Sequence, residues 1–176
     1  MLVNYELSDK NILELQGEME LIYPFYYDQL QPCSYDLRLA SDLKTIHGKT
    51  IGLNDGDYVL KPNEFILGST FEKVKLPSTI SAFFDGKSGL GRKGIGTHIT
   101  AGFIDAGFEG NITLEIKNNS DKQFRLSEGM LIGQLIFFEL KSECMRPYGS
   151  DGLNSHYQNS KGTILSKYGA NDKNNE

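Results

Sequence analysis

Residues 86–116 carry the charged groups whose types and spacing could bind an anion and hydrolyse a bond in it. Eight of the chain's 19 glycines lie in this stretch, and no acid occurs between residues 86 and 104. Glycine permits positive φ angles and lets successive N–H groups point at one anion. The segment therefore favours a phosphate-binding loop, although turns and bulges in a tightly wound sheet would need the same glycines. In chain order its acidic and basic residues are Lys87, Arg92, Lys93, Asp105, Glu109 and Glu115.

Glu115 is the candidate general base. The stretch NITLEIKN (111–118) alternates, so that Leu114 and Ile116 face one side of a strand and Glu115 faces the other. A carboxylate that lines a cleft at this position could take a proton from water. A solvent-facing Glu on an exposed sheet face would give the same periodicity, so the alternation leaves both interpretations open.

Asp105 and Phe108 are candidates for sugar binding. The sequence IDAGFEG reads as a turn around Asp105, and Phe108 could belong to the core. In a sugar site, the carboxylate would accept a hydrogen bond from a hydroxyl and the ring would pack on the apolar face of the sugar.

Composition narrows the function classes. A net charge of −5 argues against general nucleic-acid binding, and no apolar run is long enough for a transmembrane helix or a signal peptide. The two cysteines, Cys33 and Cys144, suggest a reducing, cytoplasmic location. Neither the cysteines nor the three histidines have the spacing of a protein-held zinc site, so we expect no zinc and no metal held by protein side chains.

The elements that must position these residues are mainly strands. Residues 8–17 predict a short helix that Ser8 caps and Gly17 closes. After residue 35 the chain reads as short strands separated by turn signals, which indicates an all-β sandwich or barrel. We expect one domain over residues 1–166 and a polar, flexible tail over 167–176. The clearest strand patterns are 35–40; 64–76, with Phe65, Leu67 and Phe71 on one face; 111–118; and 130–140, nearly continuously apolar as in a strand buried on both sides.

The stretch GKSGLGRKGIGTHITAGFIDAGFEGNITLEIKN closely resembles the signature of dCTP deaminases in the dCTP deaminase/dUTPase superfamily. The resemblance extends to QPCSYDLRL (31–39), VKLPSTISAFFDGKSGLGR (74–92), EGMLIGQLIFFEL (128–140) and RPYGS…SHYQNSKG (146–162). It implies a distorted β-barrel or jelly roll of the dUTPase-like type, assembled as a homotrimer with shared active sites. It further implies zinc-independent hydrolysis of the 4-amino group of dCTP, with Mg²⁺ bound through the triphosphate.

The resemblance also implies residue roles. Glu115 would be the general base, Ser88 and the carbonyl of Ala101 would orient the water, and Arg92 would help to polarise and position it. Asp105 would hold the 3′-hydroxyl of deoxyribose, and Phe108 would exclude a 2′-hydroxyl. The remaining residues assigned to the substrate are Lys87 and Gln134 on the phosphate side, Tyr148 near sugar and phosphates, and Gly89, His98, Thr100, His156 and Lys161.

The resemblance leaves the branch of the family open. Glu115 and the absence of the Gly-rich, Arg-bearing C-terminal arm of dUTPases favour deamination of dCTP to dUTP. The small residues of THITAGFIDAGFEG resemble the bifunctional branch, which forms dUMP and pyrophosphate; dUTP would then be a second substrate. A dUTP pyrophosphatase and a nucleotide-binding relative without activity are two further hypotheses. Four positions depart from the usual pattern and weaken expected phosphate contacts: Lys87, Gly89, His156 and Ser160.

Overall fold

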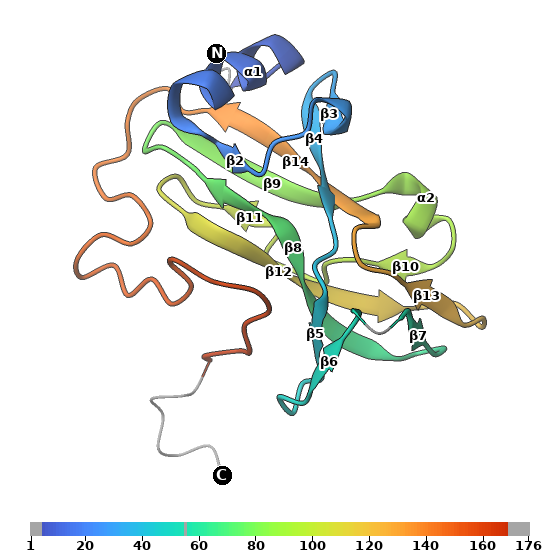
Figure 1. Ribbon diagram of the computed structural model, residues 1–176. Helices are drawn as coiled ribbons and strands as arrows, with labels where there is room; N and C mark the ends of the chain where they lie inside the picture. The colour runs from blue at the N-terminus through green and yellow to red at the C-terminus, as the bar shows by residue number, and fades with distance from the viewer. Residues whose placement is uncertain (1–4, 55, 169–176) are drawn as a thin grey trace.

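Two six-stranded sheets form the body of the protein, as the computed structural model, which describes residues 5–54 and 56–168, shows (Figure 1). The first sheet contains β1 (Tyr5–Glu6), β3 (Leu30–Gln31), β4 (Ser34–Arg38), β9 (Ile80–Gly86), β11 (Phe103–Ile104) and β14 (Leu131–Glu139). The second contains β2 (Ile22–Tyr23), β5 (Asp42–Lys44), β6 (Thr50–Gly52), β8 (Phe65–Lys75), β10 (Ile95–Gly96) and β12 (Glu109–Asn118). A separate pair joins β7 (Tyr58–Leu60) to β13 (Phe124–Leu126). The predicted all-β class is confirmed.

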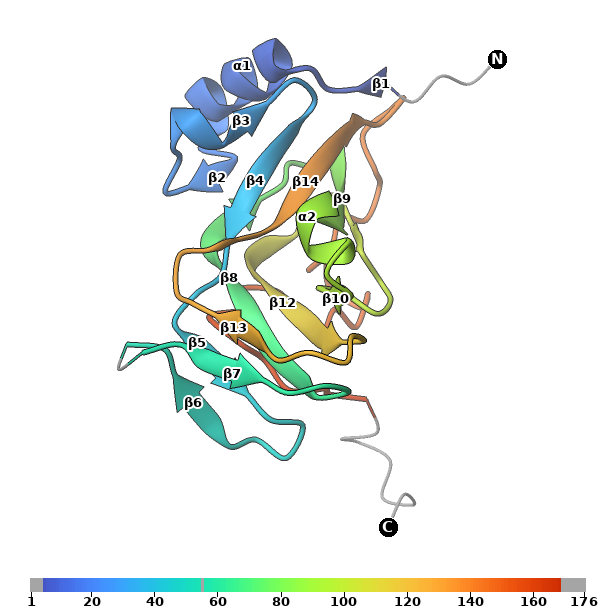
Figure 2. The same ribbon diagram turned by 90° about the vertical axis from the view of Figure 1, so that its right-hand side faces the viewer.

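Helical structure among the described residues is confined to three short segments. They are α1 (Asp9–Met19), a 3₁₀ turn over Tyr27–Gln29, and α2 (Ser88–Gly91). Figure 2 shows α1 at one end of the molecule and α2 beside β9 and β10. None of the helices in the described part of the chain is long and apolar enough to cross a membrane.

The start of α1 agrees with the prediction and its end does not. Ser8 accepts a hydrogen bond from the backbone of Asn11, whose side chain reaches back in a capping box. The predicted end at Gly17 is wrong, because the helix continues to Met19. Glu20 adopts the left-handed conformation instead, with φ of 51°, and its N–H closes the helix on the carbonyl of Gln16.

The core lies between the two sheets, and the alternation of β12 predicts its position correctly. Leu114 and Ile116 are fully buried, while Glu115 on the opposite face is partly exposed. The apolar face of β4 is buried in the same way through Tyr35 and Leu37.

Two strands differ from the sequence expectations. In β8 the side chains toward the core include Ile66 and Val74, whereas Phe71 is 40% exposed on the other side. In β14 the prediction of burial on both faces is wrong for the single chain. Phe137 is fully buried, but Phe138 on the opposite face is only half-buried, because the core between the sheets covers one face of the strand.

The segment after β14 crosses the second sheet and is tied to it by hydrogen bonds. Asn111 N donates to Ser160 O at 2.9 Å, and Ile164 N donates to Thr113 Oγ1 at 3.1 Å. Thr163 N donates to Asp42 Oδ2 at 2.8 Å, which anchors the segment to β5 as well. Of the predicted tail, residues 169–176 lie outside the described residues.

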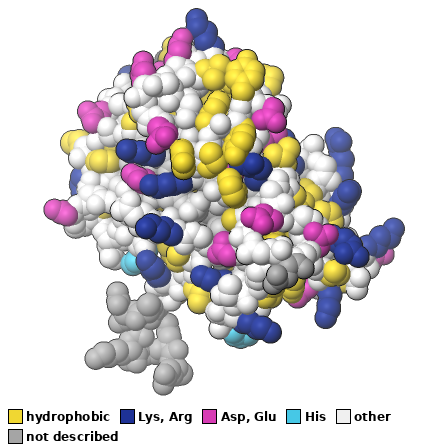
Figure 3. All heavy atoms as spheres, viewed as in Figure 1, with side chains coloured by type: hydrophobic (Ala, Val, Ile, Leu, Met, Phe, Trp, Pro, Cys, Tyr) yellow, Lys and Arg dark blue, Asp and Glu magenta, His cyan; other side chains and the backbone are white. Residues whose placement is uncertain are grey.

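On the surface near β2 and β8, the guanidinium group of Arg38 contacts two aromatic rings. The guanidinium carbon of Arg38 lies 4.2 Å from the ring centroid of Tyr26 and 4.5 Å from that of Phe71. Its Nε is 2.6 Å from Oε1 of the buried Glu72. Figure 3 shows hydrophobic side chains gathered on the upper half of this face among Lys and Arg.

Candidate active site

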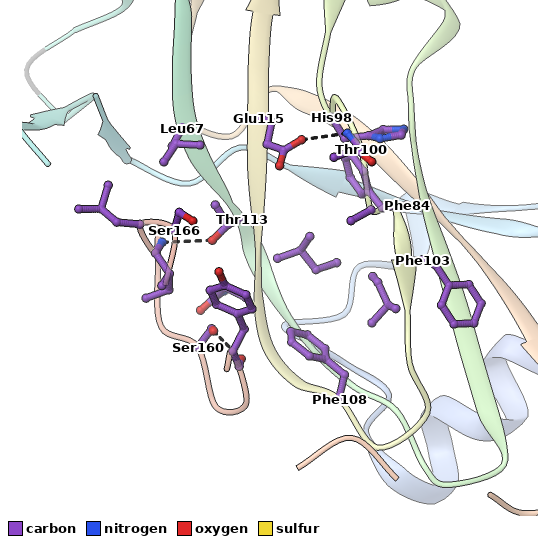
Figure 4. Close-up of a pocket in the computed structure, with 18 of the residues that line it drawn as sticks. Leu67, Phe84, His98, Thr100, Phe103, Phe108, Thr113, Glu115, Ser160 and Ser166 are labelled. Carbon is purple, nitrogen blue, oxygen red and sulfur yellow. Dashed lines mark hydrogen bonds between the residues drawn. The ribbon is translucent and has the colours of Figure 1, made fainter. Parts of the chain in front are cut away.

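A cavity of about 590 Å³ opens beside β12 and holds Glu115, Asp105 and Phe108. Its walls come from β8, β9, β12, the turn between β5 and β6, the segment between β10 and β12, and the segment after β14. Figure 4 shows Glu115 next to the 98–100 segment, with Phe108 at the other end of the view and Ser160 and Ser166 on the side of the C-terminal segment. The predicted site residues that line it are Ala101, His98, Thr100, Asp105, Phe108, Glu115 and Tyr148.

Two backbone N–H groups hold the carboxylate of Glu115. Its Oε2 accepts from Ile99 N at 2.8 Å and from Thr100 N at 3.0 Å. Oε1 makes no hydrogen bond with the described residues, so one carboxylate oxygen is fixed and the other is available to a ligand or a water molecule. This is the geometry that a positioned proton acceptor needs.

The segment that supplies these donors has an unusual backbone. Ala101 adopts φ of 61°, a conformation that residues with a side chain rarely take. Next to it, a Cβ on Gly102 would lie 2.7 Å from the carbonyl oxygen of Phe84, so the chain can pass β9 this closely only without a side chain. Strain of this kind is often found at functional sites.

His98 lies in the same wall of the cavity. Its ring meets those of Phe83 and Phe84 edge-on, with centroids 6.1 and 5.9 Å apart. Nε2 lies 3.8 Å from Oδ1 of Asp85, while Nδ1 is buried without a hydrogen-bond partner among the described residues.

The predicted turn at residues 105–108 places a carboxylate beside an aromatic ring. Phe108 N donates to Asp105 O at 3.2 Å, and Gly107 adopts φ of 91°. The ring of Phe108 is buried, with its centroid 5.8 Å from that of Tyr148. The Asp105 carboxylate is exposed and accepts no hydrogen bond from the described residues. A carboxylate and a ring so placed could bind a hydroxyl and an apolar sugar face.

The cationic residues of the predicted site, and their neighbours, lie elsewhere in the fold. None of Lys87, Ser88, Gly89, Arg92 and Gln134 lines this cavity. Lys87 Nζ is 2.6 Å from Oδ1 of the buried Asp36 on β4. Residues 86–104 contain no acid, but the fold brings the carboxylate of Asp36 next to Lys87.

His156 and Lys161 also lie away from the cavity. His156 lines a second cavity of about 480 Å³, and Lys161 is exposed and lines neither. The C-terminal wall of the first cavity, which sequence reasoning missed, includes Tyr157, Ile164, Leu165 and Ser166. The one sequence signal for this wall is the family-like SHYQNSKG stretch, which stops short of Ile164.

Glu109, near the site, and Tyr35, in the core, have shifted pKa values. The hydrogen bond from Lys73 lowers the pKa of Glu109, at the start of β12. Burial raises the pKa of Tyr35 to about 12. The described residues contain no group of three or more His, Cys, Asp or Glu that could hold a metal ion.

Comparison with known proteins adds three findings. Residues 6–140 match the model of the dCTP deaminase-like family. The chain is 42% identical over 179 aligned positions to the "dCTP deaminase, dUMP-forming" of Bifidobacterium longum strain DJO10A, covering 92% of this chain and 93% of that protein. It is 40% identical to the protein of the same name from Leifsonia xyli, covering 92% and 89%.

A solved structure shares the fold. It is the 2′-deoxycytidine 5′-triphosphate deaminase of Agrobacterium tumefaciens, with a TM-score of 0.68 and 23% identity. The match covers 78% of this chain and 50% of that one, so this chain spans about half the length of that protein.

Proposed function

The chain belongs to the dCTP deaminase-like family, and we propose that it is an enzyme that hydrolyses the 4-amino group of dCTP and releases dUMP, pyrophosphate and ammonia. The observation that carries this proposal is the position of Glu115 in one cavity with Asp105 and Phe108. A cavity that holds both a general base and a sugar-binding site suits a deoxynucleoside whose pyrimidine ring is attacked by water.

The proposed deamination begins with a water molecule between Glu115 and C4 of cytosine. The free Oε1 of Glu115 takes a proton as the water oxygen bonds to C4, and the proton is passed on toward the amino group, which leaves as ammonia. The carbonyl of Ala101 and the hydroxyl of Ser88 would orient the water. The contacts of Oε2 with Ile99 and Thr100 keep the carboxylate in place during the transfer.

The product distinguishes this proposal from the main sequence prediction, which is dUTP. The relatives that match over 92% of the chain are named dUMP-forming, and this favours the bifunctional branch. In that reaction a second water molecule cleaves the bond between the α- and β-phosphates, so that two waters are consumed for each dCTP.

We also propose that the site is completed by a second copy of the chain in a homotrimer. Glu115 and Asp105 line the cavity, while Ser88 and Arg92 do not. Two cavity-lining side chains, Ile46 and Phe103, are 62% and 56% exposed, which would suit contact with a neighbouring protomer. A neighbour could then bring its own Ser88 and Arg92 to the nucleotide.

Mg²⁺ would arrive with the triphosphate, whose charge it partly neutralises. Phosphate oxygens would be its main ligands, because the described residues offer no carboxylate cluster of their own. Asp36, the carboxylate beside the predicted phosphate residue Lys87, is already paired with it.

Product analysis tests the proposal. Purified protein with dCTP and Mg²⁺ should yield equal amounts of ammonia, dUMP and pyrophosphate. Accumulation of dUTP with ammonia would restore the simple deaminase. Turnover of dUTP but not of dCTP would indicate a pyrophosphatase, and binding of dCTP without turnover a relative that is not an enzyme.

A further inference from the structure

The second cavity adjoins the first and carries basic side chains. It is about 480 Å³ in volume and shares Asp105, Tyr148, Phe103 and Tyr157 with the first cavity. Glu115 lines only the first cavity, whereas Arg146 and His156 line only the second. A ligand that reaches Glu115 at one end and passes Asp105 would therefore extend toward Arg146.

Arg146 lines this cavity with a guanidinium group that is available to bind an anion. It makes no ion pair and no side-chain hydrogen bond with the described residues, and it is exposed. Lys87 differs, since it already lies 2.6 Å from the carboxylate of Asp36. Within the described part of the chain, the only acid that lines the second cavity is Asp105, at the boundary with the first.

We propose that Arg146 binds the terminal phosphates of the nucleotide in the second cavity, in the same chain that supplies Glu115 and Asp105. This inference rests on the proposed function and names a phosphate-binding residue for it. Arg remains protonated throughout the physiological pH range, and its planar fork can donate two parallel hydrogen bonds to a phosphate. The hydroxyl of Ser155 and the ring of His156 line the same cavity and add further polar groups.

The order of groups along the two cavities supports the assignment. Glu115 would face the cytosine ring, Asp105 would bind the 3′-hydroxyl, and the 5′-triphosphate would continue past Tyr148. A triphosphate carries up to four negative charges, so its terminal part is most stable where an unpaired cation is accessible. Arg146 would thus compensate for His156, one of the four positions whose departure from the usual family pattern weakens an expected phosphate contact.

Steady-state kinetics with variants of Arg146 test the inference. For Arg146→Gln we expect the KM for dCTP to rise about tenfold or more, with kcat for ammonia release within about threefold, because the charge-assisted contact is lost at the phosphates, away from C4, where deamination takes place. Inhibition by deoxycytidine, which has no phosphate, should not change. Arg146→Lys keeps the charge and should recover part of the affinity. Arg125→Gln, on β13 and lining neither cavity, is the matched control.

Calorimetry with inorganic triphosphate separates this inference from the proposed function, since it requires no turnover. The wild-type protein should bind it, and Arg146→Gln should weaken binding about tenfold or more. If neither protein binds it, or if the two Kd values agree within twofold, the inference is wrong. Loss of binding in the variant, together with a wild-type protein that leaves dCTP intact, would uphold Arg146 and overturn the proposed reaction.

Discussion

The carboxylate of Glu115, on β12, accepts a hydrogen bond of 3.0 Å from the backbone nitrogen of Thr100, in the segment between β10 and β11. Ile99 N makes a second contact with the same oxygen at 2.8 Å. These bonds connect the candidate base to the segment that contains Ala101, in which the water-orienting carbonyl is expected. A change in this segment should therefore affect the position of the base as well as that of the water.

The first prediction concerns Glu115→Gln. The amide keeps the shape of the side chain and can still accept from Ile99 and Thr100, but it cannot take a proton from water. We expect kcat for deamination to fall by about 10²–10⁴-fold. Single-turnover measurement at saturating dCTP checks this, and a rate within threefold of the wild type would remove Glu115 from the mechanism. Binding of dCTP should survive and serves as the control for folding.

The sequence predicts the parts of the site that lie close together in the chain. The alternation in 111–118 places Glu115 opposite the buried Leu114, and the DAG turn brings Asp105 near Phe108, as the structure shows. Periodicity alone leaves open whether Glu115 faces solvent or a cleft. That choice depends on the 97–102 segment and the C-terminal segment, which reach β12 through tertiary contacts.

Other features could not be predicted because they depend on distant partners. Lys87 pairs with Asp36 across the sheet, 51 residues away in sequence, so a charge count along the chain misses the partner. Gly17 suggests a helix end, but the left-handed turn that closes α1 lies at Glu20, so the helix continues two residues beyond Gly17. The burial of the outer face of β14 depends on which other parts of the protein cover the sheet, and the pattern of apolar residues within the strand does not contain this information.

The second prediction concerns Gly102→Ala. The added Cβ would lie 2.7 Å from the carbonyl oxygen of Phe84, and Phe84 N donates to Gly102 O at 2.7 Å, so the 97–102 segment must move away from β9. We expect a loss of about 1–3 kcal/mol in the free energy of unfolding. Because the same segment holds Glu115, kcat should fall as well.

Urea denaturation and steady-state kinetics measure the two effects of Gly102→Ala. Gly52→Ala is the matched control, since a Cβ there meets nothing within 4 Å. Unchanged stability and kcat in Gly102→Ala would show that the close approach to β9 is not required.

The third prediction concerns stability at high pH. Burial raises the pKa of Tyr35 to about 12, above the value of about 10 for an exposed Tyr. The folded state therefore keeps the phenol proton over a range in which the unfolded state loses it. The stabilisation is complete below about pH 10 and is lost as the pH rises toward 12.

Tyr35→Phe removes this titration and should flatten the dependence of the unfolding free energy on pH between about 10 and 12. The variant should also be less stable at neutral pH, because Tyr26 N, which donates to the Tyr35 hydroxyl at 2.8 Å, loses its acceptor. Tyr58, whose pKa burial also raises to about 12, accounts for a remaining slope that Tyr58→Phe should remove. Urea titrations from about pH 8 to 12 measure the slopes, and equal slopes in wild type and Tyr35→Phe between about pH 10 and 12 would contradict the assignment.

The last prediction tests whether the site is shared between copies of the chain. Light scattering should give about three times the chain mass of 19.7 kDa, as expected of a trimer.

Glu115→Gln and Ser88→Ala should each have low activity alone. When the two variants are co-expressed and purified together, some interfaces will join an intact Glu115 from one chain to an intact Ser88 from its neighbour. Random assembly of equal amounts would restore about one quarter of the sites. If each site were formed within one chain, every site would carry one of the two substitutions and mixing would restore nothing. Trimers that contain both variants but show only the summed activity of the separate variants would therefore rule out the shared site, while leaving the trimer itself in place.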